Sequence, residues 1–524
     1  MPLRKPYIFF LMFFLGGLSA LSLAPLNFMP ACFIGFSFFA FFLHKLYLCD
    51  KFSSKEKIYL FAFIGWSFGL GYFSAGLWWI PHALTIFDWR FIFLVPVLTL
   101  VIGAFLSLYW ALATVMAYFL WRDNLARFFG LAISFGFFEW LRGILFTGFP
   151  WNSIGYNLMP IPLLMQPAAF IGLYGVNIFA VFLFTLPAAF LQKCERWKAF
   201  FIFCTFFMCD IALGFYYLKH NNNEKFHPYT VRLVQPSILQ TTNFSSKDRM
   251  KNLEKLLKLT NQKTTPGQPL PDLIIWPETS VPYILAYNPS VTERIIQDLK
   301  EKQIILLGTI SVENNLYSGK EVFFNSIEAI NGQGRILARS DKKHLVPFGE
   351  YTPYASLLNA LGLNFLEDIW DTYNAAKERQ TVKLPNGLAY LPLICYEAIF
   401  PTEMDYKGPR PDFIVNITND AWFNNTTGPY QHFQQARLRA VEQRLPLLRI
   451  ANNGISAIID PYGRVISSLS LNKIGVIDNL LPASYIGPSK SPPGNFIFFL
   501  ILCAFTVAYS FFIYENPRHE NDKL

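Results

Sequence analysis

Three short segments in the hydrophilic part of the chain carry side chains that could support covalent chemistry. They offer a thiol, an ammonium group and several carboxylates at positions where short apolar runs end. Loops at the ends of strands commonly hold active-site residues. Each segment alone is weak evidence, because a carboxylate after a strand is usually solvated and a Lys-Lys pair usually lies in a wet loop. The segments are Trp276-Pro277-Glu278, Lys342-Lys343-His344 followed by Glu350, and Cys395-Tyr396-Glu397.

Cys395 is the only one of the seven cysteines that lies between about residue 220 and residue 490. A region with one cysteine cannot form an internal disulfide. Free cysteine is often a small buried hydrophobe, whereas a cysteine beside a base or a cation is a nucleophile. The cysteine by itself leaves both interpretations open.

The three segments together are complete for covalent acyl transfer. A thiol with an ordinary pKa of about 8.5 needs a base or a cation to become a competent thiolate. Glu278 could take the proton, and Lys342 could stabilise the oxyanion of a tetrahedral intermediate. A cysteine–histidine pair that uses His344 or His432 is an alternative of the type found in papain-like enzymes.

The composition indicates a membrane protein. The chain is 53% hydrophobic with a mean hydropathy of +0.31, and its apolar residues concentrate in the first 218 positions and in a short C-terminal stretch. A spanning helix needs about 20 mostly apolar residues. The first apolar run follows Arg4 and Lys5 as in a signal peptide, but more spans follow at once, so we interpret it as an uncleaved helix. The eight expected spans are 7–26, 28–48, 58–80, 91–120, 127–146, 163–191, 198–218 and 495–514.

The charges of the loops predict the orientation of these spans. With the N-terminus in the cytoplasm, the short loops on the opposite side carry only Arg90. This asymmetry follows the positive-inside rule and places the hydrophilic domain outside the cytoplasm. We therefore do not attribute the formal charge of +9 to nucleic-acid binding. The cytoplasmic side carries Arg4, Lys5, Lys45, Lys51, Lys55, Lys57, Arg122, Arg127, Lys193, Arg196 and Lys198.

The hydrophilic segment alternates short apolar runs with amphipathic stretches, which predicts one α/β or α+β domain. Asp460-Pro-Tyr-Gly463 predicts a hairpin turn, and 487–494 reads as a linker. We expect seven spans in 1–218, the soluble domain in 219–486, and the linker, the eighth span and a short cytoplasmic tail in 487–524. Strands are expected at 231–235, 273–276, 304–310, 323–330, 388–394, 413–417 and 455–459, and helices near 247–262, 290–302 and 430–444.

Residues 355–370 are apolar but too short to span a membrane. The segment is either a core helix or an arm that dips into the membrane surface or covers a lipid-binding cleft. The sequence leaves both possibilities open.

The three segments, in their order along the chain, resemble the motifs of the nitrilase superfamily, whose members use a Glu–Lys–Cys triad. Other segments resemble one membrane-embedded branch, the apolipoprotein N-acyltransferases. The resemblance covers nearly the whole chain and implies a multi-pass α-helical membrane domain of about eight spans, joined to a nitrilase-like α/β sandwich (αββα). The other segments are 416–423, 431–432, 439–442 and 449–456, and in the membrane half Ala24-Pro25, 76–80, 139–142, 149–151 and 172–175.

The resemblance implies a role for each candidate residue. Cys395 would be the nucleophile, Glu278 the general base and Lys342 the oxyanion stabiliser. Glu350 would hold Lys342 and the attacking group in place, and Tyr396 and Glu397 would shape the pocket. His344 and His432 become structural in this interpretation, and no metal or cofactor is expected.

Six further residues are candidate substrate contacts. At about Phe244 the family commonly has Trp, so this chain keeps an aromatic surface but lacks an indole N–H. Glu139 and Arg142 stand three apart near the outer end of a span, where ionisable groups are usually paired or functional. They form either a structural ion pair or a contact for a phospholipid headgroup. The six are Phe244, Trp422, Phe423, Trp370, Arg142 and Glu139.

The resemblance implies an acyltransferase of a bacterial inner membrane with its chemistry on the periplasmic side. It would move an acyl chain from a phospholipid to the N-terminal amine of a diacylglyceryl-cysteine apolipoprotein, through a thioester on Cys395. We expect a monomer. One alternative is a membrane-tethered amidase or hydrolase that passes the acyl group to water. Another is a transporter or scaffold whose soluble domain is inactive.

Overall fold

A computed structural model describes residues 5–192, 195–220, 226–239, 245–264, 269–281, 283–314, 321–360, 362, 373–485 and 494–514. The chain divides into two compact units. One comprises residues 1–222 together with 491–524, and the other comprises residues 223–490.

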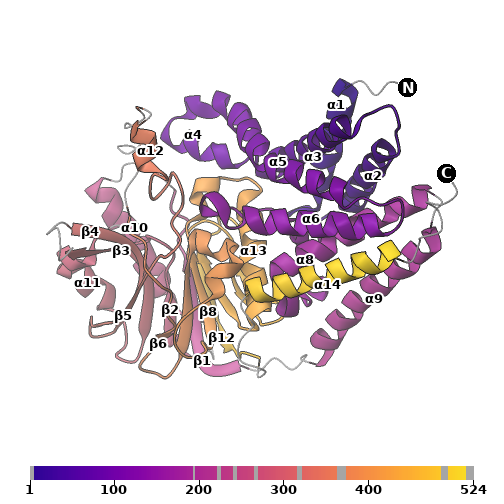
Figure 1. Cartoon of the computed structure of the whole chain (residues 1–524). Coiled ribbons are helices and arrows are strands. Elements are labelled where there is room, and N and C mark those ends of the chain that lie inside the picture. Colours follow the sequence, from indigo (N-terminus) through magenta and orange to yellow (C-terminus); the bar gives the residue numbers. More distant parts are fainter. Residues whose placement is uncertain are drawn as a thin grey trace. The chain divides into compact units, whose positions relative to one another are not determined.

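The first unit is helical (Figure 1). Seven of its described helices are long and apolar enough to cross a membrane. The predicted span 127–146 corresponds to α6, which has 17 residues. It is shorter than each of the seven candidate spans and is not one of them. The helices are α1 (Lys5–Ser19), α2 (Pro30–Tyr47), α3 (Ser54–Leu77), α4 (Leu84–Phe87), α5 (Val95–Phe119), α6 (Ala126–Arg142), α7 (Pro162–Met165), α8 (Ala168–Thr185), α9 (Arg196–His220) and α14 (Gly494–Tyr514).

Glycine and proline divide the predicted span 163–191. The structure has the short helix α7 and then α8, inside which Gly172 adopts a φ of 60°. The regular α-helix ends at Thr185, two residues before Pro187, and 3-10 turns follow over Leu186–Gln192. A proline ring clashes with the preceding helical turn, which explains the early end.

The second unit contains two six-stranded sheets. The strand orders are β12-β1-β2-β3-β4-β5 and β11-β10-β9-β8-β7-β6. In each sheet three neighbouring strands are parallel, β1-β2-β3 in one and β7-β8-β9 in the other, and the flanking pairs are antiparallel. The strands are β1 (Phe226–Gln235), β2 (Leu273–Ile275), β3 (Ile304–Asn314), β4 (Glu321–Asn331), β5 (Ile336–Asp341), β6 (Val382–Lys383), β7 (Ala389–Ile394), β8 (Phe413–Thr418), β9 (Leu447–Ala451), β10 (Ser456–Ile459), β11 (Val465–Leu469) and β12 (Gly475–Pro482).

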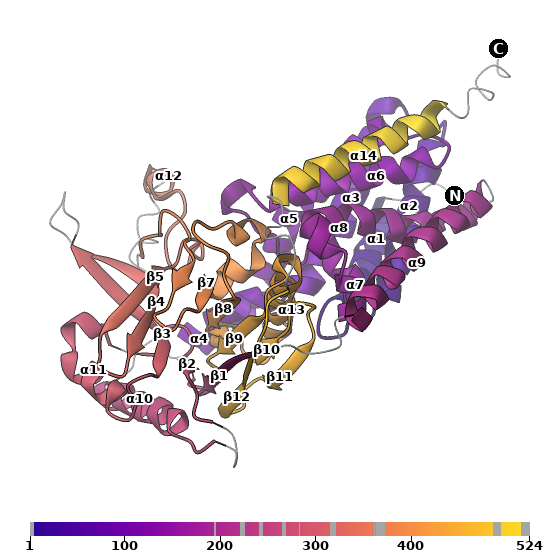
Figure 2. The same cartoon turned by 90° about the horizontal axis from the view of Figure 1, so that it is seen from below.

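The two sheets pack face to face, with helices on their outer faces (Figure 2). Apolar side chains from both sheets, such as Leu233, Ile275, Tyr390 and Val415, form the central core. The helices α10 (Ser246–Thr260) and α11 (Pro289–Ile296) cover the first sheet, and α13 (Gly428–Gln443) covers the second. The unit is therefore an αββα sandwich, as the resemblance implied.

The strand directions gather the candidate residues at sheet edges. Parallel strands end at the same edge, so the turns after β7 and β8 are neighbours. In the other sheet β5 runs in the same direction as β2 and β3, because it is antiparallel to β4 and β4 is antiparallel to β3. Glu278 follows β2, Lys342 follows β5, and Cys395 follows β7.

Several predicted elements change in extent. The helix expected over 290–302 is α11, which ends at Ile296. The hairpin turn is confirmed, since Asp460 accepts the N–H of Gly463 between the antiparallel strands β10 and β11. Of the apolar segment 355–370, the structure describes the helix α12 (Ala355–Ala360) and Gly362. The rest of that segment and most of the predicted linker lie outside the described residues.

Candidate active site

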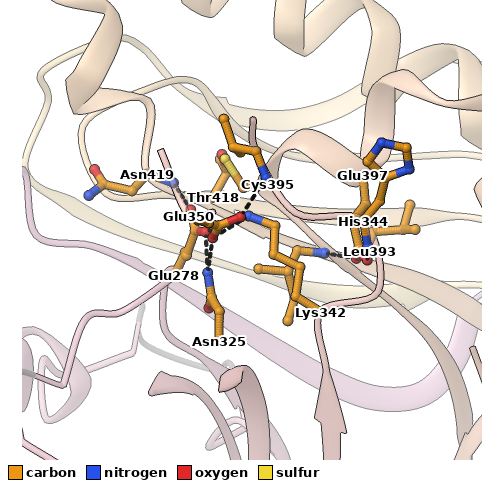
Figure 3. Close-up of polar contacts among 12 residues, drawn as sticks. Glu278, Asn325, Lys342, His344, Glu350, Leu393, Cys395, Glu397, Thr418 and Asn419 are labelled. Carbon is orange, nitrogen blue, oxygen red and sulfur yellow. Dashed lines mark hydrogen bonds and ion pairs between the residues drawn. The ribbon is translucent and has the colours of Figure 1, made fainter. Parts of the chain in front are cut away.

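Glu278 stands in a polar cluster just beyond the end of β2 (Figure 3). Its Oε1 atom accepts a hydrogen bond from Asn325 Nδ2 at 2.8 Å and lies 3.3 Å from Lys342 Nζ. Its Oε2 atom accepts the backbone N–H of Asn419 at 2.8 Å. These hydrogen bonds hold both carboxylate oxygens of Glu278 in place, and the Glu278 side chain is buried.

Gly308 on β3 allows the Glu278 turn to lie against the neighbouring strand. A Cβ atom at this position would stand 2.3 Å from the carbonyl oxygen of Pro277 and 2.7 Å from the Cα of Glu278. Both are backbone atoms, which a small side-chain rotation cannot clear. The local path of Glu278 therefore depends on glycine at this position.

Lys342 is fully buried between two carboxylates. Its Nζ lies 2.8 Å from Glu350 Oε1 and 3.3 Å from Glu278 Oε1. Burial alone would lower the pKa of Lys342, but Glu350 and Glu278 outweigh it and raise the pKa above the ordinary value of 10.5. Lys342 is thus held as a cation, the form that can donate to a developing oxyanion.

Glu350 connects the lysine to the rest of the cluster. Its Oε1 atom also accepts from Asn325 Nδ2 at 2.9 Å, and its Oε2 atom accepts the backbone N–H of Val346 at 2.8 Å. The Asn325 amide therefore bridges Glu278 and Glu350. The structure places Glu350 against Lys342, and its predicted role in holding the attacking group in place stays a prediction.

Cys395 is the first residue after β7 and begins a 3-10 helix, Cys395–Ile399. Its backbone has a φ of 51°, in the left-handed region that residues other than glycine rarely occupy. Such conformations persist where the surrounding structure enforces them, and they cluster at functional sites. The side chain lies beside Glu278 and Lys342, as their electrostatic effect on it and Figure 3 both indicate.

The surroundings of Cys395 keep its thiol protonated at rest. Burial raises the pKa of Cys395 well above its ordinary value, and the negative charge of Glu278 raises it further. Lys342 and a hydrogen bond with Thr418 act in the opposite direction. A thiol in these surroundings would need a base to become a thiolate, and Glu278 is a carboxylate beside it.

Glu397 links the turn that contains Cys395 to the turn that contains Lys342 through hydrogen bonds. Its Oε1 atom accepts the backbone N–H groups of Lys343 at 2.7 Å and His344 at 3.1 Å. Its Oε2 atom accepts the N–H of Ile394 at 2.7 Å. Arg379, also buried, donates to both oxygens. Glu397 thus joins the two turns through hydrogen bonds, and its role in shaping the pocket stays a prediction.

The two histidines and Tyr396 have contacts in or near the Cys395–Ile399 turn. His344 stacks on Phe400, with ring centroids 3.8 Å apart, and its Nδ1 lies 3.3 Å from Glu403 Oε1. Tyr396 packs edge-on against Phe400 at 5.0 Å between centroids. His432 faces the backbone carbonyl oxygen of Cys395, 3.1 Å from Nε2.

The candidate substrate contacts fall in different places. Trp422 and Phe423 lie in a 3-10 helix, Asp420–Phe423, beyond β8, and Phe423 packs edge-on against His432. Phe244 and Trp370 lie outside the described residues. Glu139 and Arg142 belong to the helical unit.

Glu139 and Arg142 form a buried ion pair at the end of α6, with Nη2 2.8 Å from Oε2 and both side chains 0% exposed. The indole N–H of Trp110 donates to Glu139 Oε1 at 2.8 Å. Arg142 Nη1 donates to the carbonyl oxygen of Trp151 at 2.9 Å, and Nη2 lies 3.3 Å from Ser153 Oγ. The pair therefore fixes the chain that follows α6, and a contact of the same residues with a phospholipid headgroup stays a prediction.

Three residues of the site were missed in the sequence. Asn325 interrupts an apolar strand pattern with a buried amide, and that polar interruption is a signal. Asn419 directly follows β8, as Cys395 directly follows β7. Its position at the end of a strand is therefore a signal that the sequence contains. Arg379 lies between predicted elements, and no local pattern marks it.

Comparisons with known proteins agree with this architecture. Residues 230–490 match the carbon-nitrogen hydrolase model, and residues 15–186 match the model of the apolipoprotein N-acyltransferase N-terminal domain. The apolipoprotein N-acyltransferase of Brucella melitensis is 40% identical over 95% of this chain and 94% of its own. That of Allorhizobium ampelinum is 44% identical over 88% and 87%.

The chain belongs to the apolipoprotein N-acyltransferase family. Among solved structures, an amidase of the nitrilase superfamily from Nesterenkonia is 15% identical, with a TM-score of 0.35 over 49% of this chain and 92% of its own. A nitrilase-superfamily member from Saccharomyces cerevisiae is 19% identical, with a TM-score of 0.34 over 56% and 97%. The apolar helices and the relatives make this member of the family a membrane protein.

Proposed function

We propose that this apolipoprotein N-acyltransferase works by a ping-pong reaction in which Cys395 is the nucleophile, Glu278 the general base and Lys342 the oxyanion stabiliser. The enzyme transfers an acyl group to apolipoprotein, and a membrane phospholipid is the donor. The observation that carries the proposal is the buried cluster in which the thiol lies beside the Glu278–Lys342–Glu350 network.

In the first half-reaction the Glu278 carboxylate takes the thiol proton of Cys395. The sulfur then attacks the ester carbonyl carbon of the phospholipid, and the negative charge on the carbonyl oxygen is stabilised by the Lys342 ammonium. The C–O bond breaks, and the leaving alkoxide takes the proton from Glu278. The products are a thioester on Cys395 and a lysophospholipid.

In the second half-reaction the neutral α-amine of the diacylglyceryl-cysteine attacks the thioester carbonyl carbon. Glu278 takes a proton from the amine nitrogen, and Lys342 again stabilises the oxyanion. The C–S bond breaks, and the thiolate regains a proton from Glu278. The products are the N-acyl lipoprotein and the free thiol, so atoms and charge balance.

The burial of the cluster supports transfer to an amine over hydrolysis. Glu278, Lys342 and Cys395 are each less than a tenth exposed. A site that excludes water protects a thioester from hydrolysis. The excess of Lys and Arg in alternate loops supports a periplasmic location for the soluble unit, in a bacterial inner membrane.

Intact-mass measurement tests the proposal. The purified protein is incubated with phospholipid, with and without a diacylated lipopeptide, alongside Cys395→Ala and Cys395→Ser. Wild type should gain the mass of one acyl chain and lose it when lipopeptide is added. An acyl-enzyme in Cys395→Ala would overturn the assignment, and free fatty acid in place of N-acyl peptide would indicate a hydrolase.

A further inference from the structure

His432 contacts the main chain of the candidate nucleophile. It lies in α13, is fully buried, and its Nε2 is 3.1 Å from the carbonyl oxygen of Cys395. A carbonyl oxygen only accepts hydrogen bonds, so Nε2 carries the proton and donates it. The bond therefore ties α13 to the turn that follows β7.

The carbonyl that His432 holds belongs to a residue in an unfavourable conformation. Cys395 has a φ of 51°, where its Cβ is crowded by the backbone. The peptide that links Cys395 to Tyr396 is planar, so fixing its oxygen fixes the plane. A fixed plane on one side and β7 on the other set the direction in which the Cys395 side chain leaves the backbone.

The other nitrogen of the imidazole ring, Nδ1, also has buried polar partners. Nδ1 lies 2.8 Å from Asp420 Oδ1 and 3.2 Å from Arg449 Nη2. Arg449 in turn donates to Asp420 Oδ2 at 2.9 Å, and Thr418 Oγ donates to Asp420 Oδ1 at 3.1 Å. The ring is thus oriented by residues from the ends of β8 and from β9.

These partners suit both charge states of the ring. A neutral ring accepts at Nδ1 from Arg449, whereas an imidazolium donates from Nδ1 to Asp420. Burial and Arg449 lower the pKa of His432, and Asp420 opposes them. The imidazolium donates from Nε2 to Cys395, and so does the neutral tautomer that has its proton on Nε2.

We propose that His432 is a positioning residue for acyl transfer, which holds Cys395 in its left-handed conformation through the carbonyl oxygen and does so in both charge states of the ring. This inference rests on the proposed role of Cys395 as the nucleophile. His432 contacts the main chain of Cys395 and takes no proton from its thiol.

Two substitutions separate this role from a merely structural one. His432→Gln places an amide nitrogen at the reach of Nε2 and keeps a donor toward Cys395. His432→Asn places its polar atoms at the reach of Nδ1, toward Asp420, and cannot span to the carbonyl. His227→Gln, on β1 and outside the cluster, is the matched control.

The measurement is single-turnover acylation of the full-length protein by phospholipid in detergent micelles, with thermal unfolding recorded in parallel. His432→Asn should lower the maximal acylation rate by about 10- to 100-fold, as misplacement of a reacting group does. The phospholipid concentration at half-maximal rate should stay unchanged, and His432→Gln should recover most of the rate. The ratio of the Asn variant to wild type should be constant between pH 5.5 and 8.

The inference fails if His432→Asn acylates as fast as wild type, if Gln and Asn are equally slow, or if the ratio changes with pH. If His432→Asn does not fold, Asp420→Asn is measured instead and should also lower the maximal rate; an unchanged rate counts against the inference. An acyl-enzyme in Cys395→Ala overturns the nucleophile assignment itself. Loss of acylation in Cys395→Ala with full activity in His432→Asn overturns only the role of His432.

Discussion

The ammonium of Lys342 lies 2.8 Å from the carboxylate of Glu350, and both side chains are largely shielded from water. This separation is shorter than the 3.3 Å between Lys342 and Glu278. Glu350 is thus the nearer counterion of the lysine, and Glu278 is the more distant of the two carboxylates that pair with it.

Replacing Glu350 by Gln should lower the acylation rate by about 100-fold, a typical effect of disabling acid–base chemistry. Among the described residues, Glu278 is then the one carboxylate within ion-pair distance of Lys342, so the ammonium is held by one carboxylate in place of two. The amide also cannot accept both from Lys342 and from the N–H of Val346. Single-turnover acylation measures the effect, with Glu293→Gln on the exposed face of α11 as a control. A rate within twofold of wild type would contradict this role.

The alkaline limb of the acylation profile should reflect the ion pairs of Lys342. Because Glu350 and Glu278 raise the pKa of Lys342 above 10.5, the ammonium persists through the pH at which a free lysine deprotonates. Wild-type acylation should therefore show no loss from this group up to pH 10.5. In Glu350→Gln one of the two negative charges that raise the pKa of Lys342 is absent. The loss of acylation rate at alkaline pH should therefore begin at a lower pH. Identical alkaline limbs in the two proteins would refute the coupling.

Acid stability should depend on Glu403, which pairs with Arg379, Lys343 and His344. Burial opposes ionisation, but these partners lower its pKa from 4.5 to about 2. The unfolded chain takes up this proton first as the pH falls. Stability present above pH 4.5 is therefore lost toward pH 2, by on the order of 3 kcal/mol. Glu403→Gln should flatten the dependence of the unfolding midpoint on pH between 5 and 3, and an unchanged slope would exclude this linkage.

Gly308→Ala should impair chemistry through the backbone of Glu278. The new Cβ would meet the carbonyl oxygen of Pro277 at 2.3 Å, so the turn must move. A shift of about 1 Å at a catalytic group costs about 100-fold in rate. Gly475→Ala on β12 is the control, because its Cβ would meet only ordinary contacts at 3.6 Å and beyond. Equal acylation by the two variants would show that the turn tolerates the displacement.

The sequence predicted the strands whose side chains are apolar and missed those whose pattern is mixed. β9 is buried throughout, but Arg449 in its centre breaks the apolar run. β5 and β11 are partly exposed strands at sheet edges, so their hydrophobic signal is weak. Edge strands gain their pairing from the neighbouring strand, which local composition does not reveal.

The same limit applies to the site. Glu278, Lys342 and Cys395 stand in segments whose residue types suggested chemistry, and the structure brings them together. Asn325 and Asp420 act through partners that are distant in sequence, since Asn325 bridges two carboxylates from other loops. Such cross-links depend on tertiary contacts, and a short motif does not contain them.

The hydrogen bonds of Glu397 have a consequence for how substitutions can alter this enzyme. Its carboxylate accepts hydrogen bonds from the backbone N–H groups of Lys343 and His344, next to Lys342, and from that of Ile394 at the end of β7, next to Cys395. Glu397 therefore couples the backbone beside Lys342 to the backbone beside Cys395. If Lys342 and Cys395 act as proposed, we expect variation in acyl-chain preference to arise from other residues, whereas a substitution at Glu397 should alter acyl transfer from every donor at once.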